Sequence, residues 1–286
     1  MARKAVKRHG SQRMMRYNGQ MRESRVRNRL VASQFHEALA DNRFFICLQP
    51  KFDLRTMEVV GAECLSRWEQ PEGNVMPPQV FMESLEHIGY ITELDFFAYE
   101  ETLKLLAAWG KKGYHRMPVS VNFSRKHFDN AGIYPRVKAL ADQYGVPHNL
   151  VEIELTESLL SERMEHVVCE MEALRKDGFL VDIDDFGTGY SSLSMLLEVP
   201  VDVIKIDKSF VKFNTREDMK TRREFMTLLS RMMQTIDTRV VCEGVETKEQ
   251  ARILMECGFG IGQGYLCDPP MEVTDFEKKY LEKMER

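Results

Sequence analysis

Short β-rich segments alternate with segments of helical length from about residue 43 to the end of the chain. Such alternation is typical of βαβ units and of a parallel sheet. About eight strands in about 240 residues predict an α/β fold that closes into a TIM-like (β/α)8 barrel rather than an open sheet. The expected strands are Phe44–Leu48, Val59–Leu65, Pro118–Asn122, Val151–Thr156, Phe179–Asp184, Val203–Asp207, Arg239–Glu243 and Gly260–Gly264.

The segments between these strands have helical patterns. Ser158–Asp177 carries apolar residues at the spacing of an amphipathic helix, and Gly178 follows where such a helix would end. Three further segments, Phe96–Trp109, Glu217–Ile236 and Thr247–Cys257, also read as helices.

Several expected strands alternate polar with apolar residues, notably Val151–Thr156, Phe179–Asp184 and Val203–Asp207. The helices should cover the apolar face of each strand, so the polar side chains should point into the barrel. Unpaired charge is very costly there. Several carboxylates that converge on one axis therefore need a cation or an equivalent partner.

The bulk composition is that of a globular protein, with 43% hydrophobic and 29% charged residues. No segment approaches the roughly 18 consecutive apolar residues of a membrane span. The basic N-terminus has no apolar stretch behind it, so it is not a secretory signal. The six cysteines include no C-x-x-C pair and no zinc spacing with a histidine, which favours reduced thiols in a cytoplasmic protein.

Positive charge is concentrated at the N-terminus. Residues 1–30 hold ten Lys/Arg against one acid, whereas the remainder has a net charge of −13. A basic arm could grip nucleic acid, but no DNA-reading motif or interleaved aromatic residue supports that reading, and we expect no DNA partner. We expect residues 1–41 to be a basic linker and residues 42–286 to be the barrel.

Polar residues cluster at the C-terminal ends of the expected strands, where barrel active sites are built. Carboxylate and amide oxygens suit Mg²⁺ or Mn²⁺ far better than zinc. Two such ions about 3.5–4 Å apart are a standard means of hydrolysing a phosphodiester. A lysine among them could orient the attacking water or help to deprotonate it. The residues are Glu63, Asn122, Glu154, Asp184, Asp185, Lys205, Glu243 and Gln263.

The same segments resemble the motifs of EAL-domain cyclic di-GMP phosphodiesterases, in the family's order. Cys64 stands where the name-giving alanine is usual. Gln49-Pro50 and Pro269–Met271 resemble the edges of the family's domain. The matching motifs are Gly61–Trp68, Val121–Ser124, Glu154–Glu157, Asp184–Ser192, Lys205–Asp207, Glu243–Thr247 and Gln263–Leu266.

The resemblance implies two ions of Mg²⁺ or Mn²⁺. Asp185 and Glu243 would complete the second metal site, while Asp184 would bridge both ions and Lys205 would orient the water. The first ion would be held by Glu63, Asn122, Glu154 and Asp184.

Other residues have implied roles around this centre. Arg67 would meet a substrate phosphate, and Gln49 and Gln263 would also take part in substrate binding. Glu157, counted among the catalytic residues, would brace the loop Phe186–Ser192. The implied reaction opens cyclic di-GMP to the linear dinucleotide pGpG.

The resemblance also implies a homodimer, and a GGDEF or sensor domain in the parent protein. Ala5–Gly10 with Arg16-Tyr17 resembles the tail of a GGDEF domain. The alternative function is an inactive EAL barrel that acts as a cyclic di-GMP receptor or a protein-binding adaptor. The departures Cys64, Cys242 and Cys267–Pro269 remove no identifiable ligand, and the completeness of the metal set favours catalysis.

Overall fold

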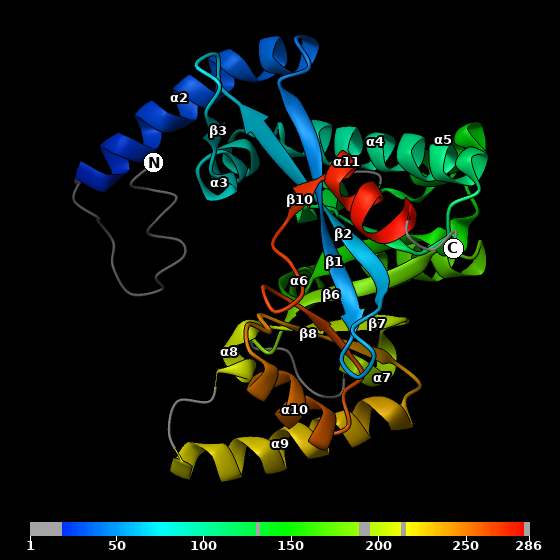
Figure 1. The fold of residues 1–286 in the computed structure, drawn as a ribbon. Coiled ribbons are helices and arrows are strands. Elements are labelled where there is room, and N and C mark those ends of the chain that lie inside the picture. The colour runs from blue at the N-terminus through cyan, green and yellow to red at the C-terminus, as the bar shows by residue number, and fades with distance from the viewer. Residues whose placement is uncertain (1–18, 130–131, 189–194, 213–215, 283–286) are drawn as a thin grey trace. The chain divides into compact units, whose positions relative to one another are not determined.

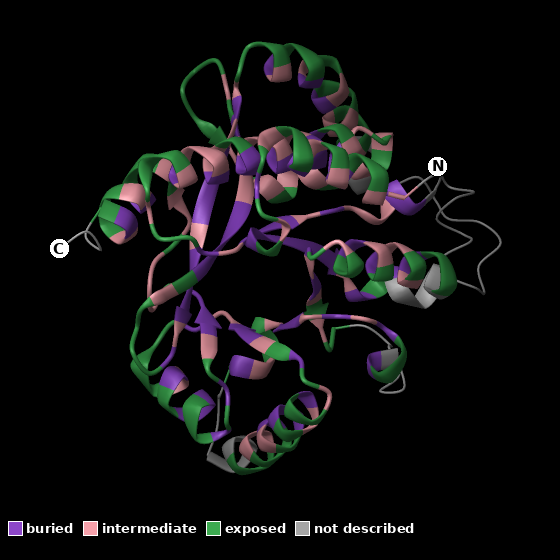
Figure 2. Cartoon of the chain, turned by 90° about the vertical axis from the view of Figure 1, so that its right-hand side faces the viewer, coloured by how far each residue is buried: buried purple, intermediate pink, exposed green. Residues whose placement is uncertain are grey.

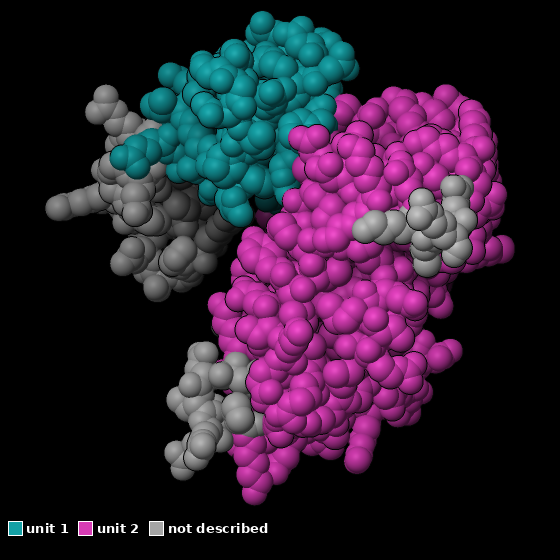
Figure 3. Space-filling model, in the orientation of Figure 1, with its two compact units in different colours: residues 1–45, 67–91 teal, residues 46–66, 92–286 magenta. Residues whose placement is uncertain are grey.

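The computed structural model describes residues 19–129, 132–188, 195–212 and 216–282. The chain divides into two compact units (Figure 3). The first comprises Met1–Phe45 and Arg67–Ile91, and the second comprises Ile46–Ser66 and Thr92–Arg286.

A closed barrel of eight strands confirms the predicted fold class (Figure 1). Ten strands are hydrogen-bonded in the order β10-β1-β9-β8-β7-β6-β5-β4-β2-β3, and the pairing of β1 with β2 closes the ring. The two short strands β3 (Val75–Met76) and β10 (Met271–Glu272) lie outside it. The barrel strands are β1 (Phe44–Asp53), β2 (Val59–Glu69), β4 (Val119–Asn122), β5 (Val151–Thr156), β6 (Leu180–Phe186), β7 (Val203–Ile206), β8 (Arg239–Glu243) and β9 (Ile261–Gln263).

One strand of the ring departs from the parallel pattern. β1 is antiparallel to β9, with Lys51 opposite Gln263, whereas the pairs from β2–β4 round to β8–β9 are all parallel. The cause is the connection between β1 and β2, which is residues 54–58. So short a connection can make a hairpin but not a parallel crossover.

The expected helices are present, most of them within a few residues of the predicted ends. Gly178 follows α6 with a φ of 92°, the left-handed conformation that glycine adopts readily. Thr247 caps α10, and its side chain and that of Gln250 form a capping box. The helices of the second unit are α4 (Ile91–Lys112, whose first residue belongs to the first unit), α5 (Tyr134–Tyr144), α6 (Glu157–Lys176), α7 (Met195–Glu198), α8 (Lys208–Val211), α9 (Arg216–Thr235), α10 (Lys248–Glu256) and α11 (Val273–Phe276), with the shorter turns η1 (Arg125–Asp129), η2 (His148–Leu150) and η3 (Glu277–Leu281).

Most residues of the barrel strands are buried (Figure 2), and on β5 this holds for both faces. On β5, the apolar Val151, Ile153 and Leu155 are fully buried, and so are the intervening Glu152 and Glu154. The apolar set belongs to the main hydrophobic core, which also contains residues of the surrounding helices. The polar set is thus enclosed by the ring itself, as the alternation predicted.

The first unit contains α2 (Gly19–Ala40) and α3 (Pro78–Ile88) around an aromatic cluster. Trp68 lies between Phe44 and Phe81, with ring centroids 4.7 Å and 5.7 Å away, and Phe35 packs against Phe44 and Tyr90. Much of the expected linker is therefore helix α2. Residues 1–18, which include the resemblance to a GGDEF tail, lie outside the described residues.

Candidate metal and active site

The parallel register brings the polar residues to one end of the barrel. Asn122 on β4 is opposite Glu154 on β5, Asp184 on β6 is opposite Thr156 at the end of β5, and Glu243 on β8 is opposite Gln263 on β9. The carboxyl ends of parallel strands meet at one edge, so residues far apart in the sequence face a common space. This arrangement gathers all eight of the residues predicted from the strand ends.

Lys205 on β7 is the centre of the cluster. Its side chain is 1% exposed, and its Nζ lies 3.0 Å from Glu63 Oε2, 3.1 Å from Asp184 Oδ1 and 2.8 Å from Glu243 Oε1. A fourth carboxylate, that of Glu154, lies 3.3 Å from the same nitrogen. One ammonium group therefore pairs with four carboxylates that come from four different strands.

Amide side chains fix Glu63 from two sides. Asn122 Nδ2 donates to Glu63 Oε1 at 2.8 Å, and Gln263 Nε2 donates to Glu63 Oε2 at 2.6 Å. Gln263 Nε2 also lies 3.2 Å from Gln49 Oε1 on β1. The three predicted amides thus form one hydrogen-bonded group, and it orients the carboxylate of Glu63.

Asp185 occupies a strained backbone position at the end of β6. Its φ is 56°, which is uncommon for a residue other than glycine, and its backbone N–H donates to Asp184 Oδ1 at 2.9 Å. Potential ligand atoms of Asp184, Asp185 and Glu243 all lie within 4.8 Å of one another. The unusual backbone lets two adjacent aspartates contribute to the same cluster.

Glu157 lies at the first position of α6 and contacts the chain that follows β6. Its Oε2 accepts a hydrogen bond of 2.9 Å from the backbone N–H of Gly187. Gly187 has a φ of 91°, and an added Cβ would lie 2.5 Å from the ring of Phe210. The loop therefore requires glycine at this position. Residues 189–192 of the predicted loop Phe186–Ser192 lie outside the described residues.

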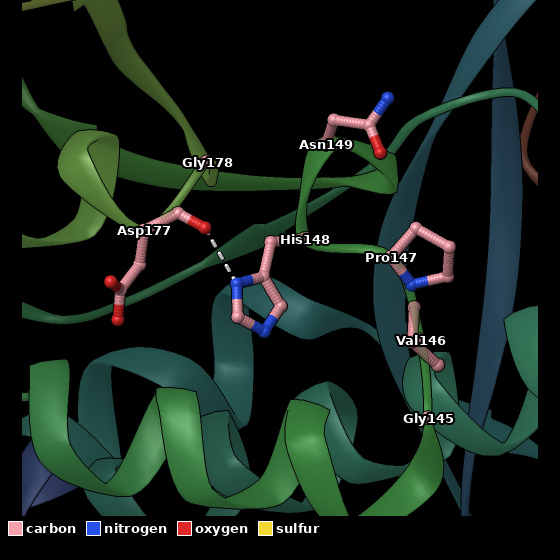
Figure 4. A pocket seen from close by; sticks show the side chains of 7 residues that line it. All are labelled: Gly145, Val146, Pro147, His148, Asn149, Asp177 and Gly178. Atoms are coloured by element: carbon pink, nitrogen blue, oxygen red, sulfur yellow. Dashed lines mark hydrogen bonds between the residues drawn. The ribbon is translucent and has the colours of Figure 1, made fainter.

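Arg67, the predicted phosphate ligand, lies on β2 in the first compact unit, whereas the cluster is built from residues of the second unit. A pocket of about 460 Å³ lies elsewhere, beside His148 (Figure 4). Its lining residues precede β5 and β6, at the opposite ends of those strands from the carboxylates. Since no predicted site residue lines it, we assign the chemistry to the cluster and not to this pocket.

The ionisation of the cluster reflects its burial and its excess of acids. Burial raises the pKa of Glu154 to about 8, and the nearby Glu63 adds to the rise. Burial also raises the pKa of Glu243 to about 7, although Lys205 opposes the change. At Glu63, Lys205 and the Gln263 amide outweigh burial, and the pKa falls to about 2. The pKa of Lys205 is raised well above its usual value, because the carboxylates outweigh the effect of burial.

These residues fit a divalent metal centre. The cluster holds five carboxylates and the single ammonium group of Lys205, which pairs with four of them, so it has room for more positive charge. Gln263 Oε1 is buried and has no hydrogen-bond partner among the described residues. Carboxylate and amide oxygens are the ligands that Mg²⁺ and Mn²⁺ prefer, and no histidine or cysteine is part of the cluster.

Sequence reasoning missed a second buried polar layer, made of Lys51, Glu152 and Asp182. Lys51 Nζ lies 2.6 Å from Glu152 Oε2 and 3.5 Å from Asp182 Oδ2. The strand alternation could have predicted two of the three, because Glu152 and Asp182 are among the polar residues expected to point into the barrel. Lys51 could not be placed without knowing that β1 is antiparallel.

Comparisons with known proteins agree with this geometry. The sequence model of the EAL domain family matches residues 32–270. Signaling protein YkoW of Bacillus subtilis is 32% identical over 250 residues, which are 86% of this chain and 30% of that protein. Cyclic di-GMP phosphodiesterase PdeR of Escherichia coli is 31% identical over 254 residues, which are 89% of this chain and 38% of that protein. The chain thus spans well under half the length of these relatives.

A solved structure, that of the PaMucR phosphodiesterase in a c-di-GMP complex, superposes with a TM-score of 0.80. The superposition covers 86% of this chain and 99% of that one, at 27% sequence identity. Within the described residues, no helix combines the length and apolar character that a membrane crossing requires. The motifs, the closed barrel and the extent of the match show that the chain belongs to the EAL domain family.

Proposed function

We propose that this chain hydrolyses cyclic di-GMP to pGpG with two bound ions of Mg²⁺ or Mn²⁺. The observation that carries the proposal is the completeness of the cluster: five carboxylates, two amides and Lys205 meet at the carboxyl end of one barrel. The relative PdeR bears the name of a cyclic di-GMP phosphodiesterase, and the PaMucR phosphodiesterase structure is a c-di-GMP complex.

Six side chains would hold the two ions. Asp184 would contribute to both, and Asp185 and Glu243 would complete the second, for which the distances among their oxygens are suitable. When bound, the ions would supply positive charge to the phosphoryl oxygens and make the attacking water more acidic. The ligands of the first ion would be Glu63, Asn122, Glu154 and Asp184.

Lys205 would act as a hydrogen-bond donor. Its Nζ lies within 3.3 Å of four carboxylates, and in the absence of metal these carboxylates raise the pKa of Lys205 well above its usual value. It would orient the nucleophilic water and stabilise developing negative charge. Gln263 and Gln49 would restrict the position of Glu63 and line the approach of the substrate.

Glu157 would act on the geometry of the second ion. Its hydrogen bond to Gly187 N–H holds the turn that begins at Asp185. Arg67 would bind a phosphate of the dinucleotide, a task for which a forked guanidinium is suited. The attacking water would form a new bond to phosphorus, the bond from phosphorus to the 3′ oxygen would break, and that oxygen would take a proton.

The test is hydrolysis of cyclic di-GMP by the purified chain with Mg²⁺ or Mn²⁺, followed by chromatography of the products. Glu63→Gln keeps the shape of the ligand but removes its charge, and we expect no detectable pGpG. Glu58→Gln, at an exposed position of the same unit, is the matched control and should retain full activity. Cyclic di-GMP binding without turnover by the unmodified chain would instead establish a receptor, and neither binding nor turnover would favour an adaptor.

A further inference from the structure

A second layer of buried charge lies directly below the candidate metal site. Lys51 is 3% exposed, and the acids around it, Glu152, Glu154 and Asp182, are 3%, 0% and 0% exposed. Nothing in the proposed reaction uses Lys51, Glu152 or Asp182. A buried charge that has no part in function would be expensive to keep, so the layer requires an explanation.

The layers are set by the alternation of the strands. Glu152 and Glu154 are two residues apart on β5, and Asp182 and Asp184 are two residues apart on β6, so each pair shares a face at two depths. β1 runs the other way, and Lys51 is opposite Gln263 in its register. The side chain of Gln49 contacts Gln263 at 3.2 Å, while that of Lys51 extends to Glu152 of the deeper layer at 2.6 Å.

Glu154 is the only residue that touches both lysines among the contacts of the described residues. Its Oε1 accepts from Lys51 Nζ at 3.4 Å, and its Oε2 accepts from Lys205 Nζ at 3.3 Å. Lys51 is itself held by Glu152 at 2.6 Å. The order Glu152, Lys51, Glu154, Lys205 is therefore a column of alternating acidic and basic side chains that ends in the metal cluster.

We propose that Lys51 is a positioning residue for the metal ligand Glu154, which it anchors from below so that the carboxylate faces the cluster. A buried lysine on a strand of the ring has little freedom to move, and its ammonium keeps one oxygen of Glu154 at a defined height. Partners that hydrogen-bond to a ligand in this way usually contribute about 10- to 100-fold to metal affinity. This inference rests on the proposed function only in taking Glu154 as a metal ligand.

The test must separate positioning from simple charge. Lys51→Met alone removes a positive charge, which by itself would favour a metal ion, and leaves the surrounding acids unpaired, which threatens folding. The double variant Lys51→Met with Glu152→Gln removes one charge of each sign, so the local net charge is unchanged. Glu152→Gln alone is the matched control, because it keeps Lys51 and its contact with Glu154.

The measurements are Mn²⁺ affinity by calorimetric titration and thermal unfolding in chelator, on the full chain. We expect the double variant to bind Mn²⁺ about 10- to 100-fold more weakly than the Glu152→Gln control, with a similar midpoint of unfolding. Equal Mn²⁺ affinity of the two variants would overturn the inference and leave Lys51 a structural residue.

The readout also distinguishes this inference from the proposed function. If the unmodified chain binds Mn²⁺ but does not hydrolyse cyclic di-GMP, the proposed function fails, while weaker Mn²⁺ binding by the double variant still supports Lys51. If the unmodified chain binds no Mn²⁺, both are overturned.

Discussion

Replacement of Lys205 by methionine tests the electrostatic balance of the cluster most directly. Methionine has a similar volume but no charge, so the variant leaves four carboxylates around the former position of Nζ, all within 3.3 Å of it at present. Removing one partner from a buried ion pair costs about 3–5 kcal/mol, because the remaining charge is uncompensated. At about 2–4 °C per kcal/mol for a chain of this size, the midpoint of thermal unfolding in chelator should fall by roughly 10 °C.

Divalent metal should reverse much of this loss. A ligand that binds only the folded state at 100 times its Kd adds about 2.7 kcal/mol to the free energy of unfolding. Without the ammonium group, the carboxylates attract a cation more strongly, so Mn²⁺ should raise the midpoint more in the Lys205→Met variant than in the unmodified chain. Hydrolysis of cyclic di-GMP by the Lys205→Met variant should be absent both in chelator and with Mn²⁺.

Differential scanning calorimetry with chelator or with Mn²⁺ measures both effects. Lys248→Met, at an exposed lysine on α10, is the control and should leave the midpoint unchanged. A Lys205→Met midpoint in chelator within about 2 °C of the unmodified chain would refute the reasoning, since the buried ammonium would then contribute under about 1 kcal/mol.

Three further predictions follow from the same contacts. In chelator, the free energy of unfolding should fall as pH rises from about 5 to 8. The reason is that the folded-state pKa values of Glu154 (about 8) and Glu243 (about 7) are raised, so the protonated forms of these residues stabilise the fold. Urea titrations at several pH values would measure this, and a free energy of unfolding that rises with pH would contradict it. Gly187→Ala should lower the free energy of unfolding by about 1–3 kcal/mol and slow hydrolysis, because the φ of 91° and the ring of Phe210 oppose a side chain at this position. An unchanged hydrolysis rate and an unchanged free energy of unfolding would argue against a fixed turn. The homodimer remains a prediction, through the region after Asp184-Asp185. Leu197, which is 77% exposed on α7, follows that region, and Leu197→Asp should shift sedimentation to the monomer; a persistent dimer would exclude Leu197 from the interface.

The sequence by itself determined the succession of strands and helices along the chain and the chemistry available at the strand ends. The alternation of Val151–Thr156 and Val203–Asp207 assigned one face to helices and the other to the barrel interior, and both segments are strands at nearly those bounds. These predictions succeeded because side-chain direction in a strand has a period of two, and because parallel strands present their carboxyl ends at one edge.

Only the tertiary structure decided which of these side chains touch, and at what depth. That Lys205 pairs with four carboxylates, and that Asn122 and Gln263 share Glu63, depends on distances around a closed ring that no local pattern encodes. The antiparallel course of β1 brings the side chain of Lys51 to Glu154. Nothing in the residues next to Lys51 in the sequence indicates this contact. The physical reason is that strand register and direction are fixed by pairing with residues distant in the sequence, and one step along a strand changes both the face and the height of a side chain.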